Sequence, residues 1–314
     1  MMEIEELKKE SKFWQVPARG VWEWAFMRVG FALVAWWSLP SMAAMSVLQE
    51  QPYPTGLANL IDLTFFADPD VYRFCYYLFC GALLVYVSGF FLPLALPLAA
   101  SMHIGMITLY NSQGATHHAY QLVSLILLAQ WLVCWTPYVW RLLGKSAIVL
   151  PVGLKWRDYM VWYSLQVIAA AYVIAGVIKL MRSKGLWIVQ SPNLAVQLMK
   201  TNAQNYHDKL FVDVEFEQRA VVAQFMIDNP NVTRLFLGGG LMIELLAFLL
   251  LVNRVWALVV GIFILALHWG IDMTMGLNFK YQMTVVAIFL VNVPFWTGWL
   301  GKKLVGGKDD ALLK

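Results

Sequence analysis

Long apolar runs recur along the chain from about residue 21 to residue 300, and short polar connections separate them. A bilayer core of about 30 Å needs about 20 apolar residues in helical conformation, so each run of this length predicts one membrane-spanning helix. A helix also satisfies its backbone polar groups within one segment, as lipid requires. The pattern therefore predicts an all-α polytopic membrane protein with about eight transmembrane helices. The predicted spans are residues 21–45, 71–91, 93–110, 119–140, 158–181, 234–252, 255–275 and 281–300.

Prolines fall near the ends of several of these runs. Pro40 lies late in the first span, and Pro93 and Pro97 lie at the start of the third. Proline at such positions begins or kinks a helix rather than forbidding it. The stretch GFFLPLALP leaves almost no loop between the second and third spans, so we expect these two helices to follow each other directly.

Two segments outside the spans have amphipathic patterns. Residues 1–20 open with alternating acidic and basic residues and no apolar core before a cleavage site, which predicts an interfacial amphipathic segment rather than a signal peptide. Residues 182–233 contain two stretches with helical apolar spacing and charged faces, which predict interfacial amphipathic helices. A lid over a site and a packed loop are both compatible with this second pattern.

Composition supports the membrane class and excludes others. Of the 314 residues, 60% are hydrophobic and only 13% are charged, and the mean hydropathy is +0.62. The chain has no glycine-rich phosphate loop or nucleotide fingerprint, so an ATP-driven pump is unsupported and no nucleic acid partner is expected. The three cysteines lie inside apolar spans without the spacing of a metal site, so we expect no metal.

Basic residues predict the orientation. With eight spans the two ends of the chain share one side, and the short connections on that side carry most of the lysines and arginines. The positive-inside rule places this side in the cytoplasm. The predicted organisation is one transmembrane domain over residues 21–300, an extracytoplasmic insert at 182–233 and a cytoplasmic tail at 301–314. The insert is also basic, but connections of its length count less in this rule.

This orientation brings polar residues of four spans to the outer half of the membrane, where a site is expected. They are His117, His118, Lys179, His268, Lys280 and Tyr281. Ordinary structural roles remain open for most of them. An alternative role for Lys179 is that of a snorkelling anchor near the helix end, and an alternative role for the histidine pair is that of a helix cap. His268 lies well inside a span and needs a partner or a cavity, whereas Glu244 is expected to pair with a buried cation that the sequence does not identify.

Four stretches of the chain carry a family resemblance. In order they are THHAY, YVIAGVIKL, GGGLMIELLAFLLL and LHWGIDMTMGLNFKYQM. Together they resemble the horizontally transferred transmembrane domain family, best known as the membrane part of vitamin K-dependent gamma-glutamyl carboxylase. The resemblance covers about residues 21 to 300 and keeps the order and similar spacing of the family's motifs.

The resemblance implies an enzyme that couples oxygenation of reduced vitamin K, a menaquinol- or phylloquinol-type hydroquinone, to proton abstraction. In the carboxylase this step drives gamma-carboxylation of a glutamate in a peptide or protein, with O2 and CO2 as co-substrates. By motif, Lys179 matches the family's base, and His118 and His268 match its two histidines; we predict these three as catalytic. The expected quinone-binding residues are His117, Tyr120, Tyr172 and Tyr281. Burial disfavours a charged ammonium, so a neutral lysine amine could act as the base.

Two departures from the family pattern leave other functions open. Few residues follow the last span, where the animal carboxylase carries a large lumenal domain, which puts peptide recognition of that kind in doubt. The stretch KLMRSKGLW also carries extra residues between Lys179 and Trp187. The alternatives are a non-catalytic membrane protein that assists export or modification of a partner, and a carrier that uses buried His and Lys as relay groups. No inverted repeat supports the carrier.

Overall fold

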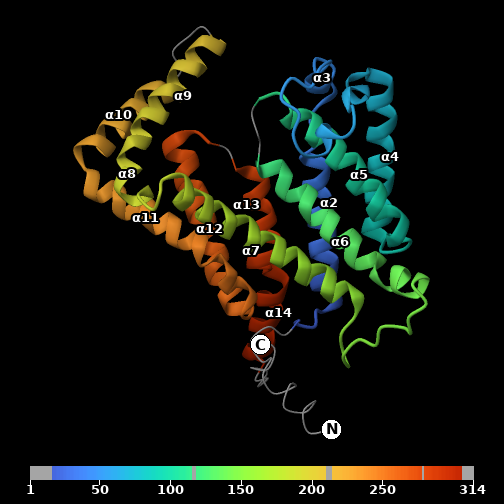
Figure 1. Ribbon diagram of the computed structural model, residues 1–314. Helices are drawn as coiled ribbons and strands as arrows, with labels where there is room; N and C mark the ends of the chain where they lie inside the picture. Colours follow the sequence, from blue (N-terminus) through green and yellow to red (C-terminus); the bar gives the residue numbers. More distant parts are fainter. Residues whose placement is uncertain (1–15, 115–117, 210–213, 278, 306–314) are drawn as a thin grey trace.

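The computed structural model describes residues 16–114, 118–209, 214–277 and 279–305, and every regular element within them is a helix (Figure 1). The predicted all-α class is therefore confirmed. The predicted interfacial segment at residues 1–20 and the predicted tail at residues 301–314 lie mostly outside the described residues.

Six helical stretches are long and apolar enough to cross a membrane, counted over the described residues. They are α4 (Pro69–Ser88), α5 (Leu92–Asn111), α6 (His118–Leu142), α7 (Trp156–Arg182), α12 (Arg254–Met275) and the composite stretch Lys280–Leu304. Six helices of this length and composition are typical of a multi-pass integral membrane protein. The six stretches correspond to six of the eight predicted spans.

The other two predicted spans, 21–45 and 234–252, contain shorter helices. Helix α2 (Val21–Trp37) has 17 residues and ends shortly before Pro40. Helix α11 (Pro230–Leu245) has 16 residues and is followed by the 3-10 helix η4 (Ala247–Leu251). A straight crossing needs about 20 residues, so the count of eight transmembrane helices stays a prediction.

The last predicted span is one helix by sequence but is broken in the structure. Helix α13 (Lys280–Val286) passes into a π-helical turn, η5 (Ala287–Val291), and α14 (Val293–Leu304) follows. Asn292 separates them in the left-handed region, with φ of 46°. The turn between α4 and α5 is tight, as expected, because Gly89 and Phe91 both adopt positive φ just before Leu92.

The long helices pack in sequence order on one side of the molecule. Helices α4, α5, α6 and α7 contact their neighbours in the chain, and α2 packs on α4 (Figure 1). Helix α7 also contacts α11 and η4, so it joins this group to the group of α11 and α12. One large apolar core runs through both groups and includes residues from α2, α6, α7, α12 and η5.

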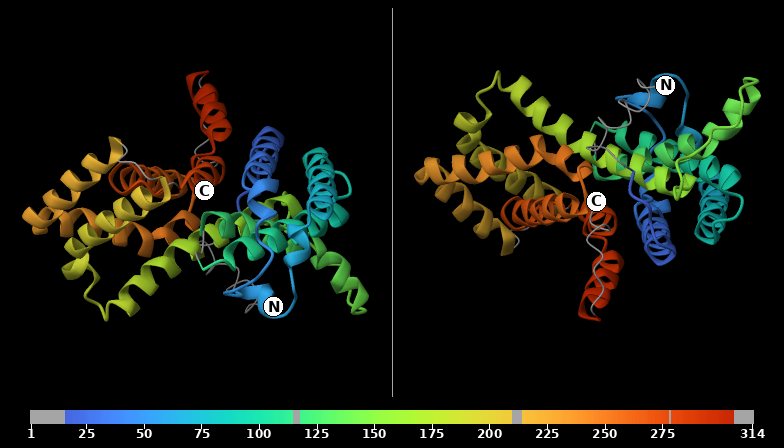
Figure 2. Two further views of the ribbon diagram at one scale, coloured as in Figure 1. Left: turned by 90° about the horizontal axis from the view of Figure 1, so that it is seen from above. Right: turned by 90° about the horizontal axis from the view of Figure 1, so that it is seen from below.

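The segment 182–233 forms helices, as its apolar spacing predicts. Its elements are α8 (Trp187–Gln190), η3 (Ser191–Asn193), α9 (Leu194–Lys209) and α10 (Val214–Asp228). The connection between α2 and α4 also contains short helices, which are α3 (Met42–Met45), η1 (Gly56–Asn59) and η2 (Thr64–Ala67). Helices α9 and α10 pack through Ala195, Leu198, Ala223 and Met226, and they lie far from α4 and α5 (Figure 2). Their interfacial position is not tested by this packing and stays a prediction.

A glycine in α12 permits close approach of the broken last span. A Cβ atom added at Gly261 would lie 2.8 Å from the Leu290 Cβ, which is closer than real side chains approach. We expect Gly261→Ala to lower the free energy of unfolding by about 1–3 kcal/mol, because the added methyl overpacks this contact. Gly298→Ala is the matched control, since nothing lies within 4 Å of a Cβ there. Thermal unfolding of both purified variants would measure the difference, and equal stabilities would contradict this packing.

Candidate functional site

Lys179 and Glu244 form an ion pair between α7 and α11. The Lys179 Nζ donates to both carboxylate oxygens of Glu244, with 2.6 Å to Oε2. Gly176, one turn earlier on α7, allows this approach, because a Cβ there would lie 3.0 Å from the Leu245 Cδ2. The cation that pairs with Glu244 is therefore Lys179, which is only partly buried.

The two partners of this pair differ in exposure. The Glu244 side chain is 8% exposed, whereas that of Lys179 is 33% exposed. The Lys179 Nζ also lies 5.5 Å from the ring centroid of Trp187, within the range of a cation–π contact. The ammonium therefore has a second favourable contact, while the carboxylate depends on Lys179 for its counter-charge.

Tyr172 and His268 form a second pair, between α7 and α12. The Tyr172 hydroxyl lies 2.8 Å from the His268 Nε2, and both side chains are buried. The Phe279 ring stacks on the imidazole with ring centroids 4.5 Å apart. The His268 Nδ1 is buried and has no hydrogen-bond partner in the part of the chain that the structure describes. One nitrogen of the imidazole is therefore hydrogen-bonded to Tyr172, and the other has no partner among these residues.

The two pairs belong to one polar cluster. Tyr172 and Lys179 are seven residues apart on α7, which places them on the same face of that helix. Glu244 interacts electrostatically with Tyr172, and Lys179 with His268. Helices α11 and α12 approach each other beside the cluster, where a Cβ at Gly240 would lie 2.8 Å from Leu267. A lysine, a carboxylate, a phenol and an imidazole are thus available together for proton transfer.

An aromatic group lies beside this cluster. The rings of Tyr120 and Tyr281 have centroids 4.9 Å apart, and Tyr281 also contacts Trp37 at 5.0 Å. The Lys280 Nζ lies 5.1 Å from the centroids of both Trp37 and Tyr281. Because Phe279 contacts His268 only two residues before Tyr281, the start of α13 joins the aromatic group to the polar cluster.

The described histidines of α5 and α6, His103 and His118, form their hydrogen bonds outside this cluster. His118 is exposed, and its Nδ1 lies 2.9 Å from the Gln121 Oε1 on its own helix. His117 lies outside the described residues. His103 is fully buried, and its two ring nitrogens lie 2.8 Å from the hydroxyls of Ser38 and Ser124, so it has the ordinary role of a satisfied packing residue.

A groove of about 560 Å³ lies between α5, α6 and η1. Its polar lining comes from Thr55, Thr108, Asn111, Gln121 and Ser124, and the other lining residues are apolar. None of the described residues of the predicted site lines this groove. The volume of this groove would suit a small organic ligand. The ionisable residues of the polar cluster do not line it, so the groove and the polar cluster are separate features.

The sequence does not reveal two aromatic residues that contact the polar cluster, Phe279 and Trp187, and it does not reveal a second group of buried charged residues. Phe279 and Trp187 stand next to predicted residues but carry no motif of their own. A second set of charged residues, Arg19, Glu23, Asp158 and Arg254, is buried at the opposite ends of the helices. In the sequence these arginines count only toward the positive-inside rule, and their burial with two carboxylates could be found only from the fold. No group of three or more potential metal ligands occurs among the described residues.

Comparison of the chain with protein-family models, curated proteins and solved structures found no match. The family resemblance of the four sequence stretches therefore stays a prediction.

Proposed function

We propose that this protein is an integral membrane enzyme that oxygenates a reduced quinone, with Lys179 as the base that starts the reaction. The observation that supports this proposal best is the Lys179–Glu244 pair beside Tyr172 and His268. Three of these four residues are predicted site residues, and two of them, Lys179 and His268, match residues of two separate family motifs. The proposed substrate is a menaquinol- or phylloquinol-type hydroquinone, and O2 is the oxidant.

The base must be an uncharged amine when it accepts a proton from the hydroquinone. Transfer of one proton from Lys179 to Glu244 turns the ion pair into a neutral amine and a carboxylic acid, without changing the net charge. Apolar surroundings penalise the ion pair more than the neutral pair, so this transfer is aided by the burial of Glu244 and by exclusion of water from the site. Glu244 is then the proton store that lets Lys179 act as a base.

The remaining steps follow from the chemistry of a hydroquinone anion. O2 adds to this anion, and the overall reaction converts hydroquinone and O2 into quinone epoxide and water. Tyr172 and His268 are proposed to position and protonate the oxyanions that form. Tyr120, Tyr281 and His117 are proposed to contact the quinone ring, and His118 is proposed as the third catalytic residue. Coupling to CO2 and a glutamate of a peptide or protein is part of the proposal by resemblance alone.

The orientation proposed for this enzyme places both termini in the cytoplasm and the site at the extracytoplasmic side. The support is the concentration of basic residues in short connections on one side. Helices α9 and α10 would then cover the site from outside the membrane.

One observation favours a non-catalytic alternative, in which the protein assists export or modification of a partner. The described site residues do not line the large groove, and the His118 side chain is exposed rather than directed toward Lys179. Such a protein would bind no quinone, and changes at Lys179 would have no effect in any redox assay.

The test is quinol epoxidation by purified protein in lipid nanodiscs, with the epoxide measured by mass spectrometry. Lys179→Ala is expected to lower the rate about 10²–10⁴-fold, as loss of a general base does. The double variant Lys179→Met with Glu244→Gln keeps the site neutral and folded and is expected to be equally inactive. Lys200→Met, on the exposed face of α9, is the matched control. Full activity in either Lys179 variant would overturn the proposal.

A further inference from the structure

A buried charged cluster lies at the ends of the helices opposite to Lys179 and His268. On α7, Asp158 and Lys179 are separated by about 32 Å of helix, and on α12, Arg254 and His268 are separated by about 21 Å. This cluster is therefore remote from the proposed reaction, and nothing in that reaction uses it.

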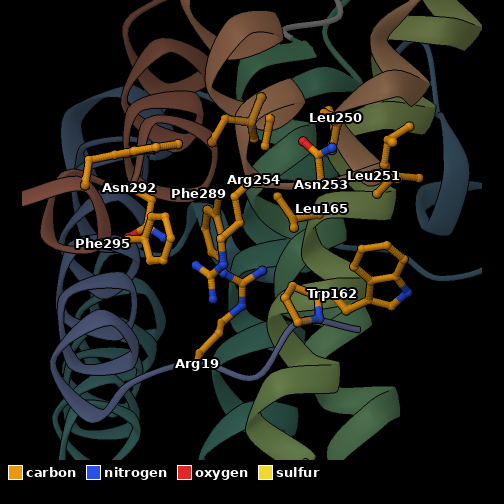
Figure 3. A pocket seen from close by; sticks show the side chains of 15 residues that line it. Arg19, Trp162, Leu165, Leu250, Leu251, Asn253, Arg254, Phe289, Asn292 and Phe295 are labelled. Atoms are coloured by element: carbon orange, nitrogen blue, oxygen red, sulfur yellow. The ribbon is translucent and has the colours of Figure 1, made fainter. Parts of the chain in front are cut away.

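Glu23 is the centre of this cluster. Its Oε1 accepts from the Arg19 Nη1 at 2.8 Å, from the Asn292 Nδ2 at 2.6 Å and from the Arg254 Nη1. The Arg254 Nη2 donates to the Ala18 carbonyl at 2.8 Å. The guanidinium groups of Arg19 and Arg254 lie next to each other, between Phe289 and Phe295 on one side and Trp162 on the other (Figure 3).

Several polar atoms of this cluster are buried without partners. The Nε atoms of Arg19 and Arg254 and the Oδ1 of Asn292 make no hydrogen bond within the described residues. All three side chains are more than nine-tenths buried, and all three line the same small cavity. Buried polar atoms without partners are costly, and the two N–H donors outnumber the one acceptor oxygen, so an acceptor in the cavity would satisfy more of them than a donor would.

The charges around the cavity do not balance. The buried residues Arg19 and Arg254 are balanced by Glu23 and Asp158, and the half-buried Arg157 beside them brings one further positive charge. Burial lowers the pKa of Arg19 to about 10, which still leaves it charged at neutral pH. Helices α2, α7, α12 and α14 all begin at this end of the molecule, and their positive dipole ends add to the surplus (Figure 1).

Size limits what can fill the cavity. Its volume is about 20 Å³, room for a single water-sized species. Phosphate and carboxylate groups are much too large for this space, whereas a chloride ion is only somewhat larger than a water molecule and needs a small outward movement of the lining side chains. We infer that this cavity is a binding site for a halide ion, chloride in the cell, held by the Nε–H groups of Arg19 and Arg254. Water is the competing occupant, because it could also donate to the Asn292 Oδ1.

The experiment measures thermal unfolding of the purified full chain at constant ionic strength in sodium chloride, bromide, gluconate or phosphate. Chloride and bromide are expected to raise the unfolding temperature by several degrees in a saturable manner, whereas gluconate and phosphate are not. In crystals grown with bromide, an anomalous peak is expected between Arg19 and Arg254. Equal unfolding temperatures in all four salts, or a cavity that holds only water, would overturn the inference.

Two variants keep the test decisive. Arg19→Gln removes one donor and the surplus charge, and it is expected to abolish the halide effect. If this variant does not fold, Ala257→Leu fills the cavity from α12 without changing any charge and has the same expected result. Lys184→Gln, which removes an exposed positive charge outside this cluster, should keep the full halide effect. A halide response that persists in the Ala257 variant would contradict binding in this cavity.

Discussion

Replacing Glu23 with leucine is expected to lower the free energy of unfolding by about 3–5 kcal/mol, because the change leaves two buried arginines without their counter-charge. The Glu23 side chain is only 6% exposed, and a single oxygen accepts hydrogen bonds from Arg19, Arg254 and Asn292. Without this carboxylate the adjacent guanidinium groups repel each other in surroundings that water does not screen. The loss is therefore far larger than for an exposed carboxylate.

Equilibrium unfolding in detergent, followed by tryptophan fluorescence, would measure this loss. Glu50→Gln is the control, because Glu50 is exposed and its change should alter stability by less than about 0.5 kcal/mol. Glu23→Gln keeps an acceptor oxygen but removes the charge, so its cost is expected to lie between those two. A Glu23→Leu variant as stable as the control would show that the buried cluster does not form.

The Lys179–Glu244 pair is expected to respond unequally to removal of its two members. Lys179→Met leaves the buried Glu244 carboxylate without a counter-charge and is expected to cost about 3–5 kcal/mol. Glu244→Gln leaves an ammonium that is one-third exposed and already contacts Trp187, so this variant is expected to cost less than about 1.5 kcal/mol. The sign of the difference follows from the greater exposure of Lys179 and from its contact with Trp187.

A double-mutant cycle measures the coupling directly. Combining Lys179→Met with Glu244→Gln removes both charges and is expected to recover most of the stability lost in Lys179→Met. This recovery would also show that loss of activity in the double variant has a chemical cause rather than a folding defect. Equal costs of the two single changes, with no recovery in the double variant, would contradict the ion pair.

The positions of the long helices could be predicted because an apolar run of about 20 residues has one stable state in lipid. The ends of the helices depend on contacts that the run itself does not contain. Asn292 interrupts the last span in a left-handed conformation, and its side chain donates to Glu23, 269 residues earlier in the chain. Helix α2 ends before Pro40, so the apolar stretch from 21 to 45 is not one continuous helix.

The candidate site was predictable in its residue types but not in its pairing. Lys179, Tyr172 and His268 stand out as polar groups in apolar helices, yet which group meets which depends on how far α7, α11 and α12 rotate against one another. Gly176 and Gly240 set that rotation by allowing close contacts with Leu245 and Leu267. His118 shows the opposite outcome, because its side chain lies on an exposed part of the first turn of α6. A sequence gives the order of residues along a helix, and packing gives the face that each helix buries.

The hydrogen bonds of Glu23 join a helix that is made early in synthesis to residues that are made much later. Glu23 accepts from Arg254 and Asn292, which lie 231 and 269 residues further along the chain. While the ribosome is still translating the intervening helices, only Arg19, four residues before Glu23, is present to neutralise this carboxylate. The second arginine and the asparagine reach Glu23 only after α12 and the start of α14 have entered the membrane. Closure of this cluster is therefore a late step of co-translational assembly and marks the arrival of the last helices in their final places.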